Sequence, residues 1–314
     1  MKESLVKYLA GLLDADGSLS FHFVNKTQSG ECRVGLLIYL CASERIDRQG
    51  FVANLPNLTR LGKSSVIPPR GDLVIGNKAT RQTYNVNVWQ VSKRADLEML
   101  LPRVIKHMVI KAKHWQWLLD VWREKRGGQI SAEEKEALVA ASKESRRTNA
   151  GPIKPKNHPT WAWLAGYLDG DGSYIHSCKT RKNGWAHWKI AVSAVAHVND
   201  RCVLEFLLKS FGGNIYQDPR SPALHWRRML GYQNRSFAEQ FLPNLAKHSR
   251  FKRDKIDAIL HHHRQRLSIP GPNRRYCEIE GCERLVHGHG LCHLHYERKW
   301  HRKRRQGVSD SLNA

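Results

Sequence analysis

The chain has 314 residues, with 52 Lys and Arg against 28 Asp and Glu, so its formal net charge at pH 7 is +24. This charge favours a polyanionic partner, and nucleic acid is the first candidate. A membrane surface would attract the same charge, but no stretch of the sequence approaches the ~18 apolar residues that a spanning helix needs, which argues against a membrane protein.

The first predicted helix lies in residues 1–16, MKESLVKYLAGLLDAD. Although partly apolar, this segment lacks the small-residue cleavage site of a signal peptide. We therefore expect the protein to act inside a cell, in bacterial or phage cytoplasm or in an organelle. Three of the seven cysteines lie close together beside histidines, which favours a metal site in a reducing compartment over a disulfide framework.

Two segments of the chain are repeated. Residues 8–18 read YLAGLLDADGS and residues 163–173 read WLAGYLDGDGS, and each pattern predicts a helix followed by a strand. Further on, LPRVIKHMVIKAK (101–113) matches LPNLAKHSRFKRDK (242–255), with Lys and His at the same places. The two matches predict an internal duplication.

The predicted organisation has two repeats, a linker and a small terminal module. Within each repeat the pattern predicts a helix, a hairpin, a helix, a hairpin and a final helix, which is a mixed α+β fold with antiparallel sheets. The linker contains one short polar helix and a stretch rich in Pro, Gly and Lys. The predicted bounds are 1–126 for the first repeat, 127–159 for the linker, 160–268 for the second repeat and 272–306 for the module.

Each repeated helix ends in two acids, although a helix C-terminus carries partial negative charge and repels carboxylates. Small residues such as Gly11 and Gly166 would let the two helices pack closely, which would bring Asp16 and Asp171 together. These carboxylates would repel each other unless a divalent cation lay between them, and oxygen ligands suit Mg²⁺. Taken singly, either motif also fits acids that are simply solvated by water.

The two nine-residue motifs, LAGLLDADG and LAGYLDGDG, resemble those of the LAGLIDADG homing endonucleases of the single-chain, two-repeat kind, over about residues 4–265. The resemblance implies that the last acid of each motif, Asp16 or Asp171, binds the catalytic Mg²⁺ or Mn²⁺, with Asp14 and Asp169 as the less favoured pair.

The resemblance also implies a basic residue near the active site in the final helix of each repeat. The matching positions are Lys111 and Lys252, which would stabilise developing charge on the phosphate. A strand-end Gln that organises water in many family members has no counterpart, and Glu44 and Asn199 stand nearest to its place.

The function implied is site-specific double-strand cleavage of a long asymmetric DNA target by metal-dependent hydrolysis, encoded within an intron. An RNA-binding maturase that assists intron splicing is the alternative, because the same fold and charge would serve it. We expect a monomer, since one chain carries both repeats.

Each repeat of this family lays an antiparallel sheet in a major groove, where Arg, Lys and Asn read base edges at about 1 to 3 kcal/mol per bidentate pair. Any one of these side chains would also fit a phosphate or water. Alternation along the strands predicts that the DNA-facing residues are Ser20, His22, Lys26, Arg33, Tyr39, Asn85 and Asn87 in the first repeat, and Ser173, Ser177, Lys179, Arg181, Lys189, Ser193, Tyr216 and Arg227 in the second.

The C-terminal module carries four soft or borderline metal ligands, Cys277, Cys282, Cys292 and His295, with the spacing C-x4-C-x9-C-x2-H. This set predicts a tetrahedral Zn²⁺ site, and the module resembles the zinc-finger tails of phage and intron nucleases. The substitute ligands are His287, His289 and His293. The basic residues predicted to hold flanking phosphates are Arg298, Lys299, Arg302, Lys303, Arg304 and Arg305.

Overall fold

The computed structural model describes residues 1–25, 31–47, 49–69, 72–75, 78–81, 84–125, 128–147, 159–180, 186–217, 219, 221–230, 235–268, 277–282, 284, 290–299 and 301. The chain divides into two compact units, Met1–His263 and Arg264–Ala314, and the first unit contains both repeated motifs. Among the helices described, none has both the length and the apolar character needed to cross a membrane.

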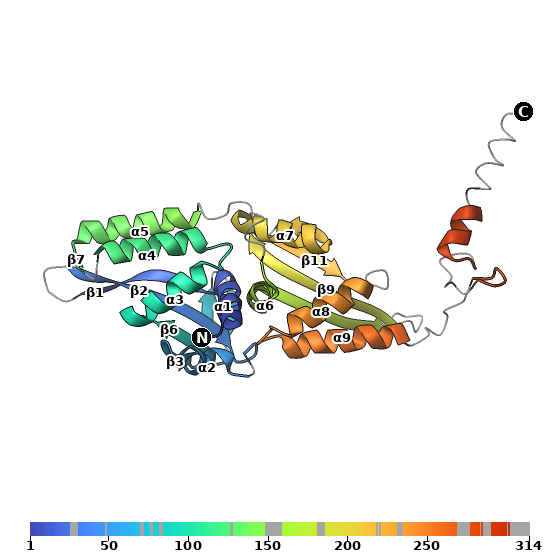
Figure 1. Ribbon diagram of the computed structural model, residues 1–314, viewed down its shortest axis with the longest axis horizontal. Helices are drawn as coiled ribbons and strands as arrows, with labels where there is room; N and C mark the ends of the chain where they lie inside the picture. Colours follow the sequence, from blue (N-terminus) through green and yellow to red (C-terminus); the bar gives the residue numbers. More distant parts are fainter. Residues whose placement is uncertain are drawn as a thin grey trace, which may run out of the picture. The chain divides into compact units, whose positions relative to one another are not determined.

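The first repeat builds an antiparallel sheet in the order β1-β2-β6-β3, with β7 paired to β2 and a separate ribbon of β4 and β5 (Figure 1). Its elements are α1 (Glu3–Ala15), β1 (Ser18–Asn25), β2 (Cys32–Ser43), α2 (Phe51–Thr59), β3 (Lys63–Ile67), β4 (Asp72–Ile75), β5 (Lys78–Arg81), β6 (Val86–Val91), α3 (Arg94–Ile105), α4 (Ala112–Lys125), β7 (Gln129–Ile130) and α5 (Ala132–Arg147).

The second repeat follows the same plan, with an antiparallel sheet in the order β10-β11-β9-β8. Its elements are α6 (Trp161–Asp171), β8 (Gly172–Thr180), β9 (Ala186–His197), the short 3-10 helix η2 (Val198–Asp200), α7 (Arg201–Phe211), β10 (Asn214–Gln217), β11 (Ala223–Met229), α8 (Arg235–Ala246) and α9 (Arg253–Ser268). The prediction of one final helix was wrong in both repeats, because each has two, α3 with α4 and α8 with α9.

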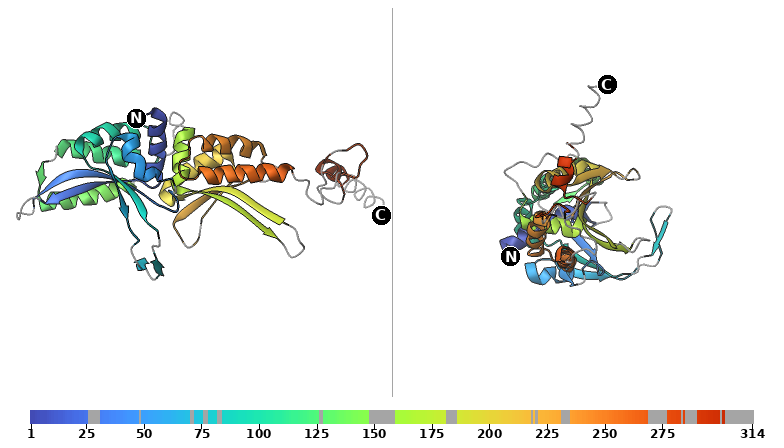
Figure 2. Two further views of the ribbon diagram at one scale, coloured as in Figure 1. Left: turned by 90° about the horizontal axis from the view of Figure 1, so that it is seen from below. Right: turned by 90° about the vertical axis from the view of Figure 1, so that its right-hand side faces the viewer.

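The two sheets lie on either side of a central pair of helices, α1 and α6 (Figure 2). Along β2, every second side chain is buried, including Val34, Leu36, Ile38 and Leu40. Because side chains alternate across a strand, the remaining positions of β2 form the other face of the sheet. We call that face of each sheet the open face.

Glycines allow α1 and α6 to pack backbone against backbone, as the small-residue pattern predicted. A Cβ on Gly11 would overlap the carbonyl oxygen of Trp163, and a Cβ on Gly166 would overlap that of Tyr8. The two contacts are equivalent under the duplication. The helices share one hydrophobic core that runs through both repeats, so the repeats are held together as one folded unit.

Candidate active site

The last acids of the two motifs lie where α1 and α6 end side by side. Asp16 is the C-cap of α1 and Asp171 is the last residue of α6. A Cβ on Gly170 would lie 2.9 Å from Oδ2 of Asp16, so the Asp16 carboxylate is in close contact with the backbone of the other helix. The small residue at position 170 therefore makes room for this carboxylate.

The surroundings of these acids disfavour two negative charges. Burial, followed by the nearby charge of Asp16, raises the pKa of Asp171 to about 7, and Lys111 and Lys252 oppose this rise. Burial also raises the pKa of Asp16 against the effect of the same two lysines, of which Lys252 has the larger. The pair thus lies where an added cation would stabilise both ionised carboxylates.

A lysine neutralises each helix end. The ammonium of Lys111 donates to the carbonyl oxygens of Leu13, Ala15 and Gly17 at 3.1, 3.0 and 2.8 Å. The ammonium of Lys252 donates to those of Leu168, Gly170 and Gly172 at 3.0, 3.0 and 2.6 Å. An ammonium has three donors, so both lysines have used theirs on backbone carbonyls around the end of α1 or α6.

The family pattern predicted these lysines within the final helices, but the structure places them just outside. Lys111 and Lys252 stand directly before α4 and α9, and their carbonyl oxygens accept the first helical bonds. Burial lowers the pKa of Lys111, and it lowers that of Lys252 to about 8. Both ammonium groups point to carbonyl oxygens, so any effect on a phosphate would be exerted through the charge of the lysine.

The first acid of each motif is a buried structural group. Asp14 accepts hydrogen bonds from the amides of Val109 and Lys111 at 2.7 and 2.9 Å, and from Nε1 of Trp163 in the other repeat at 2.9 Å. These bonds satisfy amides of the turn that leads into α4. Asp14 is thus 2 % exposed and held by donors on two segments, the turn before α4 and helix α6.

Asp169 makes the equivalent set of bonds in the second repeat. It accepts from the hydroxyl groups of Tyr8 and Ser249 at 2.7 and 2.6 Å, and from the amides of Arg250 and Phe251 at 2.7 and 3.1 Å. The turn between the last two helices is therefore held by a motif aspartate in both repeats, a role that sequence patterning did not reveal.

No protein-family model matches this chain, and no curated protein does. Among solved structures, I-SmaMI bound to an uncleaved DNA target with calcium ions is 18% identical, with a TM-score of 0.58, and the match covers 84% of this chain and 94% of that one. The LAGLIDADG homing endonuclease I-SmaMI bound to cleaved DNA is 19% identical, with a TM-score of 0.59 and coverage of 84% and 92%. This chain has the LAGLIDADG homing endonuclease fold.

A second neighbour supports the same conclusion. The LAGLIDADG meganuclease I-AabMI bound to uncleaved DNA is 13% identical, with a TM-score of 0.57, and the match covers 84% of this chain and 91% of that one. The predicted α+β architecture of two LAGLIDADG repeats is confirmed.

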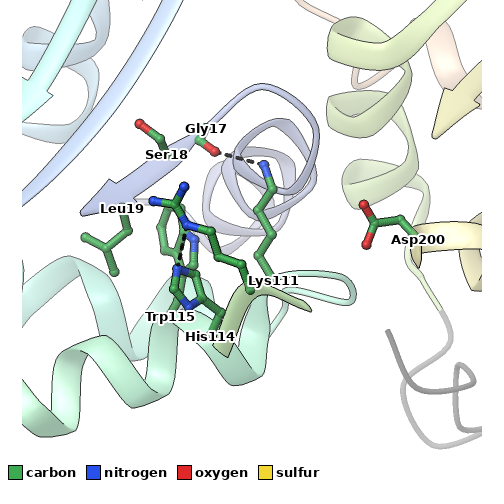
Figure 3. A pocket seen from close by; sticks show the side chains of 8 residues that line it. Gly17, Ser18, Leu19, Lys111, His114, Trp115 and Asp200 are labelled. Carbon is green, nitrogen blue, oxygen red and sulfur yellow. Dashed lines mark hydrogen bonds between the residues drawn. The ribbon is translucent and has the colours of Figure 1, made fainter. Parts of the chain in front are cut away.

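A pocket of about 240 Å³ opens beside the end of α1 (Figure 3). Its lining is Gly17, Ser18, Leu19, Lys111, His114, Trp115, Arg146 and Asp200. In this LAGLIDADG fold the pocket joins three segments: the end of α1, the start of α4 and the connecting helix α5, with Asp200 added from the second repeat.

His114 is the most buried polar side chain of the pocket, at 3 % exposed. Burial, with the charges of Arg146 and Lys111, lowers its pKa to about 4, so the ring is neutral at pH 7. Its Nε2 accepts a hydrogen bond of 3.3 Å from Nε of Arg146, which leaves the proton on Nδ1, 3.2 Å from Oγ of Ser145.

Asp200 enters the pocket from just beyond β9. Its backbone caps α7, but its carboxylate makes no capping hydrogen bond. Burial raises the pKa of Asp200, and Lys111 opposes that rise. Of the two weak candidates for positioning water, Glu44 accepts hydrogen bonds from Asn85 at 3.1 and 3.0 Å, and Asn199 is exposed on η2.

Strand register places most predicted DNA-facing residues of the first repeat on its open face. Ser20 pairs with Leu37, His22 with Gly35, and Tyr39 with Ser18, all opposite the buried positions of β2. Arg33 shares this parity and is exposed. Lys26 lies outside the described residues.

The prediction that Asn87 faces DNA was wrong. It is 5 % exposed and donates to Asp47 at 3.2 Å, because on β6 its parity is that of the buried Trp89 and Val91. Gln90, which was missed, pairs with Tyr39 and Lys63 and so lies on the open face. Apolar residues stand at both parities of β6, so alternation along this strand did not show which of its faces is buried.

In the second repeat, the register brings several predicted residues together. Ser193 lies between Ser173 and Arg227, and it is 5 % exposed among these neighbours. The guanidinium of Arg227 lies 5.1 Å from the ring centre of Tyr216, which also stacks on His225, a residue not predicted.

For other predicted DNA-facing residues of the second repeat, the structure gives only the position along the strand. The backbone of Ser177 pairs with that of Lys189. For Lys179 and Lys189 only the strand backbone is described, and Arg181 lies outside the described residues.

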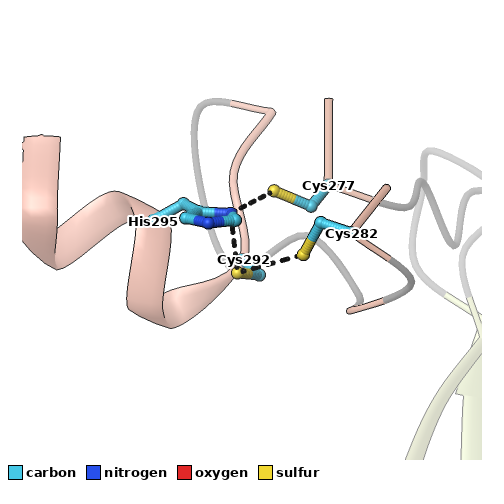
Figure 4. Close-up of side chains that lie close together, drawn as sticks. All are labelled: Cys277, Cys282, Cys292 and His295. Atoms are coloured by element: carbon cyan, nitrogen blue, oxygen red, sulfur yellow. Dashed lines mark hydrogen bonds between the residues drawn. The ribbon is translucent and has the colours of Figure 1, made fainter. Parts of the chain in front are cut away.

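The four predicted ligands of the terminal module converge (Figure 4). Their ligand atoms all lie within 4.8 Å of one another. Nδ1 of His295 is 3.1 Å from Sγ of Cys277 and 3.5 Å from Sγ of Cys292, which is 3.9 Å from Sγ of Cys282. Ligand atoms of tetrahedral zinc lie about 3.5 to 3.8 Å apart, so the set fits such an ion.

The remaining predictions for the module are only partly described. Nε2 of His293 lies 3.7 Å from a carboxylate oxygen of Glu297, and His293 is not among the four residues of the cluster. Arg298 and Lys299 belong to the helical segment that carries His295. The residues outside the described part are His287, His289, Arg302, Lys303, Arg304 and Arg305.

Proposed function

We propose that this protein is a monomeric, site-specific endonuclease that cuts both strands of a long asymmetric DNA target by metal-dependent hydrolysis. The observation that carries the proposal is the meeting of Asp16 and Asp171 at the paired ends of α1 and α6. This pair lies between two sheets that present different side chains, such as Tyr39 and Gln90 in the first and Ser193 and Arg227 in the second. Two unlike faces on one chain favour a target without two-fold symmetry.

The acid pair fits a divalent cation such as Mg²⁺ or Mn²⁺. Hard cations prefer carboxylate oxygens, and the raised pKa of Asp171 reflects a negative charge that lacks sufficient compensation. When bound, such an ion lowers the pKa of its water and stabilises the leaving oxygen. The calcium ions with I-SmaMI, a protein of the same fold, support a divalent ion here.

The surrounding residues hold the acids and the DNA. Lys111 and Lys252 fix the two helix ends and contribute positive charge there. Asp14 and Asp169 tie each helix end to the opposite repeat, which keeps the two carboxylates in register. The open faces contact the grooves and the phosphates, and the net charge of +24 draws the DNA in.

Repeated selection of cut molecules tests this function on a pool in which any sequence can be the target. Supercoiled plasmids carrying random inserts are incubated with the protein in Mg²⁺, and the linear products are recovered, sequenced and cut again. We expect one asymmetric sequence to be enriched, with both strands cut, and no cutting in EDTA. Failure to enrich a sequence, or cutting that persists in EDTA, would contradict the proposal.

We also propose that the terminal module binds one structural Zn²⁺ through Cys277, Cys282, Cys292 and His295. The convergence of four ligand atoms supports this assignment. The described apolar cluster of the module is small, so its folding would depend on the ion. The basic residues after the cluster, such as Arg298, would then contact phosphates that flank the target.

Elemental analysis of the purified protein should find about one zinc per chain. Cys277→Ser or Cys292→Ser should lose this zinc, because each removes one of four thiolate or imidazole ligands. Cys41→Ser, which changes an exposed cysteine of β2, is the control and should keep it. Native protein that folds without zinc would disprove the site.

A further inference from the structure

We propose that Arg146 binds a backbone phosphate in the pocket beside Lys111, and that this contact favours cleavage of one DNA strand over the other. The inference rests on the proposed endonuclease function and deepens it. It assigns to the connecting helix α5 a part in the active site, where sequence patterning predicted only a linker.

A phosphate near the first-repeat half of the active site needs a cation with free donors. Lys111 does not supply one, since its three donors are used on carbonyls of α1. Arg146 does, because Nε bonds to His114 and no partner of its two terminal nitrogens lies in the part of the chain that the structure describes. A guanidinium with two such nitrogens suits the oxygens of a phosphate.

His114 positions this arginine. The neutral ring accepts from Arg146 and is itself fixed by Ser145, so the guanidinium is held before DNA arrives. Less conformational freedom is then lost when a phosphate binds.

The charges that line the pocket also favour an anion. The cations Lys111 and Arg146 outnumber the single acid, Asp200, so the lining has one net positive charge. Lys111 compensates Asp200 in part, since its charge lowers the pKa of that carboxylate. The hydroxyl of Ser18 adds a further polar group to the wall.

The sequence of the second repeat differs from the first at the positions that build this pocket. By the same alignment that pairs Lys111 with Lys252, Lys255 stands in the place of His114. The segment that matches α5 in the same alignment lies beyond α9, and it carries Cys277 and Cys282 of the terminal module. Asp47 precedes α2 as Asp200 precedes α7. The carboxylate of Asp47 accepts hydrogen bonds from the amides of Phe51 and Val52 and so caps α2, whereas that of Asp200 makes no capping hydrogen bond. The two halves of the active centre are therefore unequal.

Binding measurements without cleavage test the phosphate contact directly. Target duplexes with one neutral methylphosphonate at each position in turn are bound in Ca²⁺. We expect one position at which neutralisation weakens wild-type binding about tenfold and leaves Arg146→Ala unaffected. Lys143→Ala is the control, since it removes a charge from the exposed surface of α5 and should respond as the wild type does.

Strand-specific cleavage in Mg²⁺ is the second measurement. With each strand labelled separately, Arg146→Ala should slow one strand about tenfold, leave the other within about threefold, and accumulate nicked DNA. Arg146→Lys should restore this rate only in part, because it keeps the charge without the planar fork.

The outcomes separate the two proposals. Wild-type protein that neither binds nor cuts a selected target refutes both. Wild-type protein that cuts, while Arg146→Ala matches Lys143→Ala in the phosphate scan and on both strands, refutes the role of Arg146 and leaves the endonuclease function standing.

Discussion

Asp16→Asn or Asp171→Asn should reduce double-strand cleavage at least about a thousandfold, while affinity for the target stays within a few fold. Each change removes a carboxylate proposed to hold the metal, and several kcal/mol of transition-state stabilisation would depend on that ion. The faces proposed to bind DNA lie on the sheets and keep their side chains. Cleavage is measured in Mg²⁺ and binding by gel shift in Ca²⁺.

The matched control is Asp120→Asn, which alters an exposed carboxylate on α4 that bonds to Gln116. It should cut at the wild-type rate. Full activity in the Asp16 or the Asp171 variant would contradict the catalytic assignment. Loss of binding together with cleavage would show that the acid pair serves mainly to hold DNA.

The same substitution tests the electrostatics of the site. The folded-state pKa of Asp171, about 7, is raised above the usual 3.8, so the folded state binds the proton more tightly. Stability from this group is therefore full below about pH 4 and is lost as pH rises to about 7. At pH 8 in EDTA, Asp171→Asn should raise the melting temperature, so its inactivity would not come from unfolding.

Gly166→Ala should destabilise the protein by about 3 kcal/mol or more and abolish cleavage. The added Cβ would overlap the carbonyl oxygen of Tyr8, so the two helix backbones must separate. The ends of α1 and α6 would then no longer hold Asp16 and Asp171 together. Thermal unfolding should show a melting temperature lower by roughly 6 to 12 °C.

Gly35→Ala is the control for this effect. A Cβ at this position of β2 would lie 3.4 Å from the carbonyl oxygen of His22, a distance that small shifts accommodate. Its melting temperature and cleavage should stay close to those of the wild type. If Gly166→Ala were equally stable, the close packing of α1 and α6 would not be what holds the repeats together.

The sequence by itself determined the features that depend on local pattern. The repeated helix motif predicted the duplication, the small residues at the helix contact, and the meeting of Asp16 with Asp171, because helical spacing places these residues on one face. Ligand spacing likewise predicted the Cys277 to His295 cluster, since its members lie within a short segment.

Tertiary structure alone decided which groups meet across elements. The alignment located Lys111, but its three carbonyl partners follow from the packing of the α3–α4 turn against the end of α1. Nothing in the motif of Asp14 indicated that its carboxylate would accept hydrogen bonds from amides nearly a hundred residues away. Burial of Asn87 depended on the register of β6 with its neighbours.

The pocket shows most clearly that sequence patterns do not reveal contacts between separate elements. Arg146 stands in a polar helix between the repeats, His114 on α4 and Asp200 beyond β9, and no periodic pattern connects the three. Side-chain periodicity reports only which face of one helix or strand is buried. Convergence of charged groups from separate elements is set by how those elements pack, and that information exists only in the folded chain.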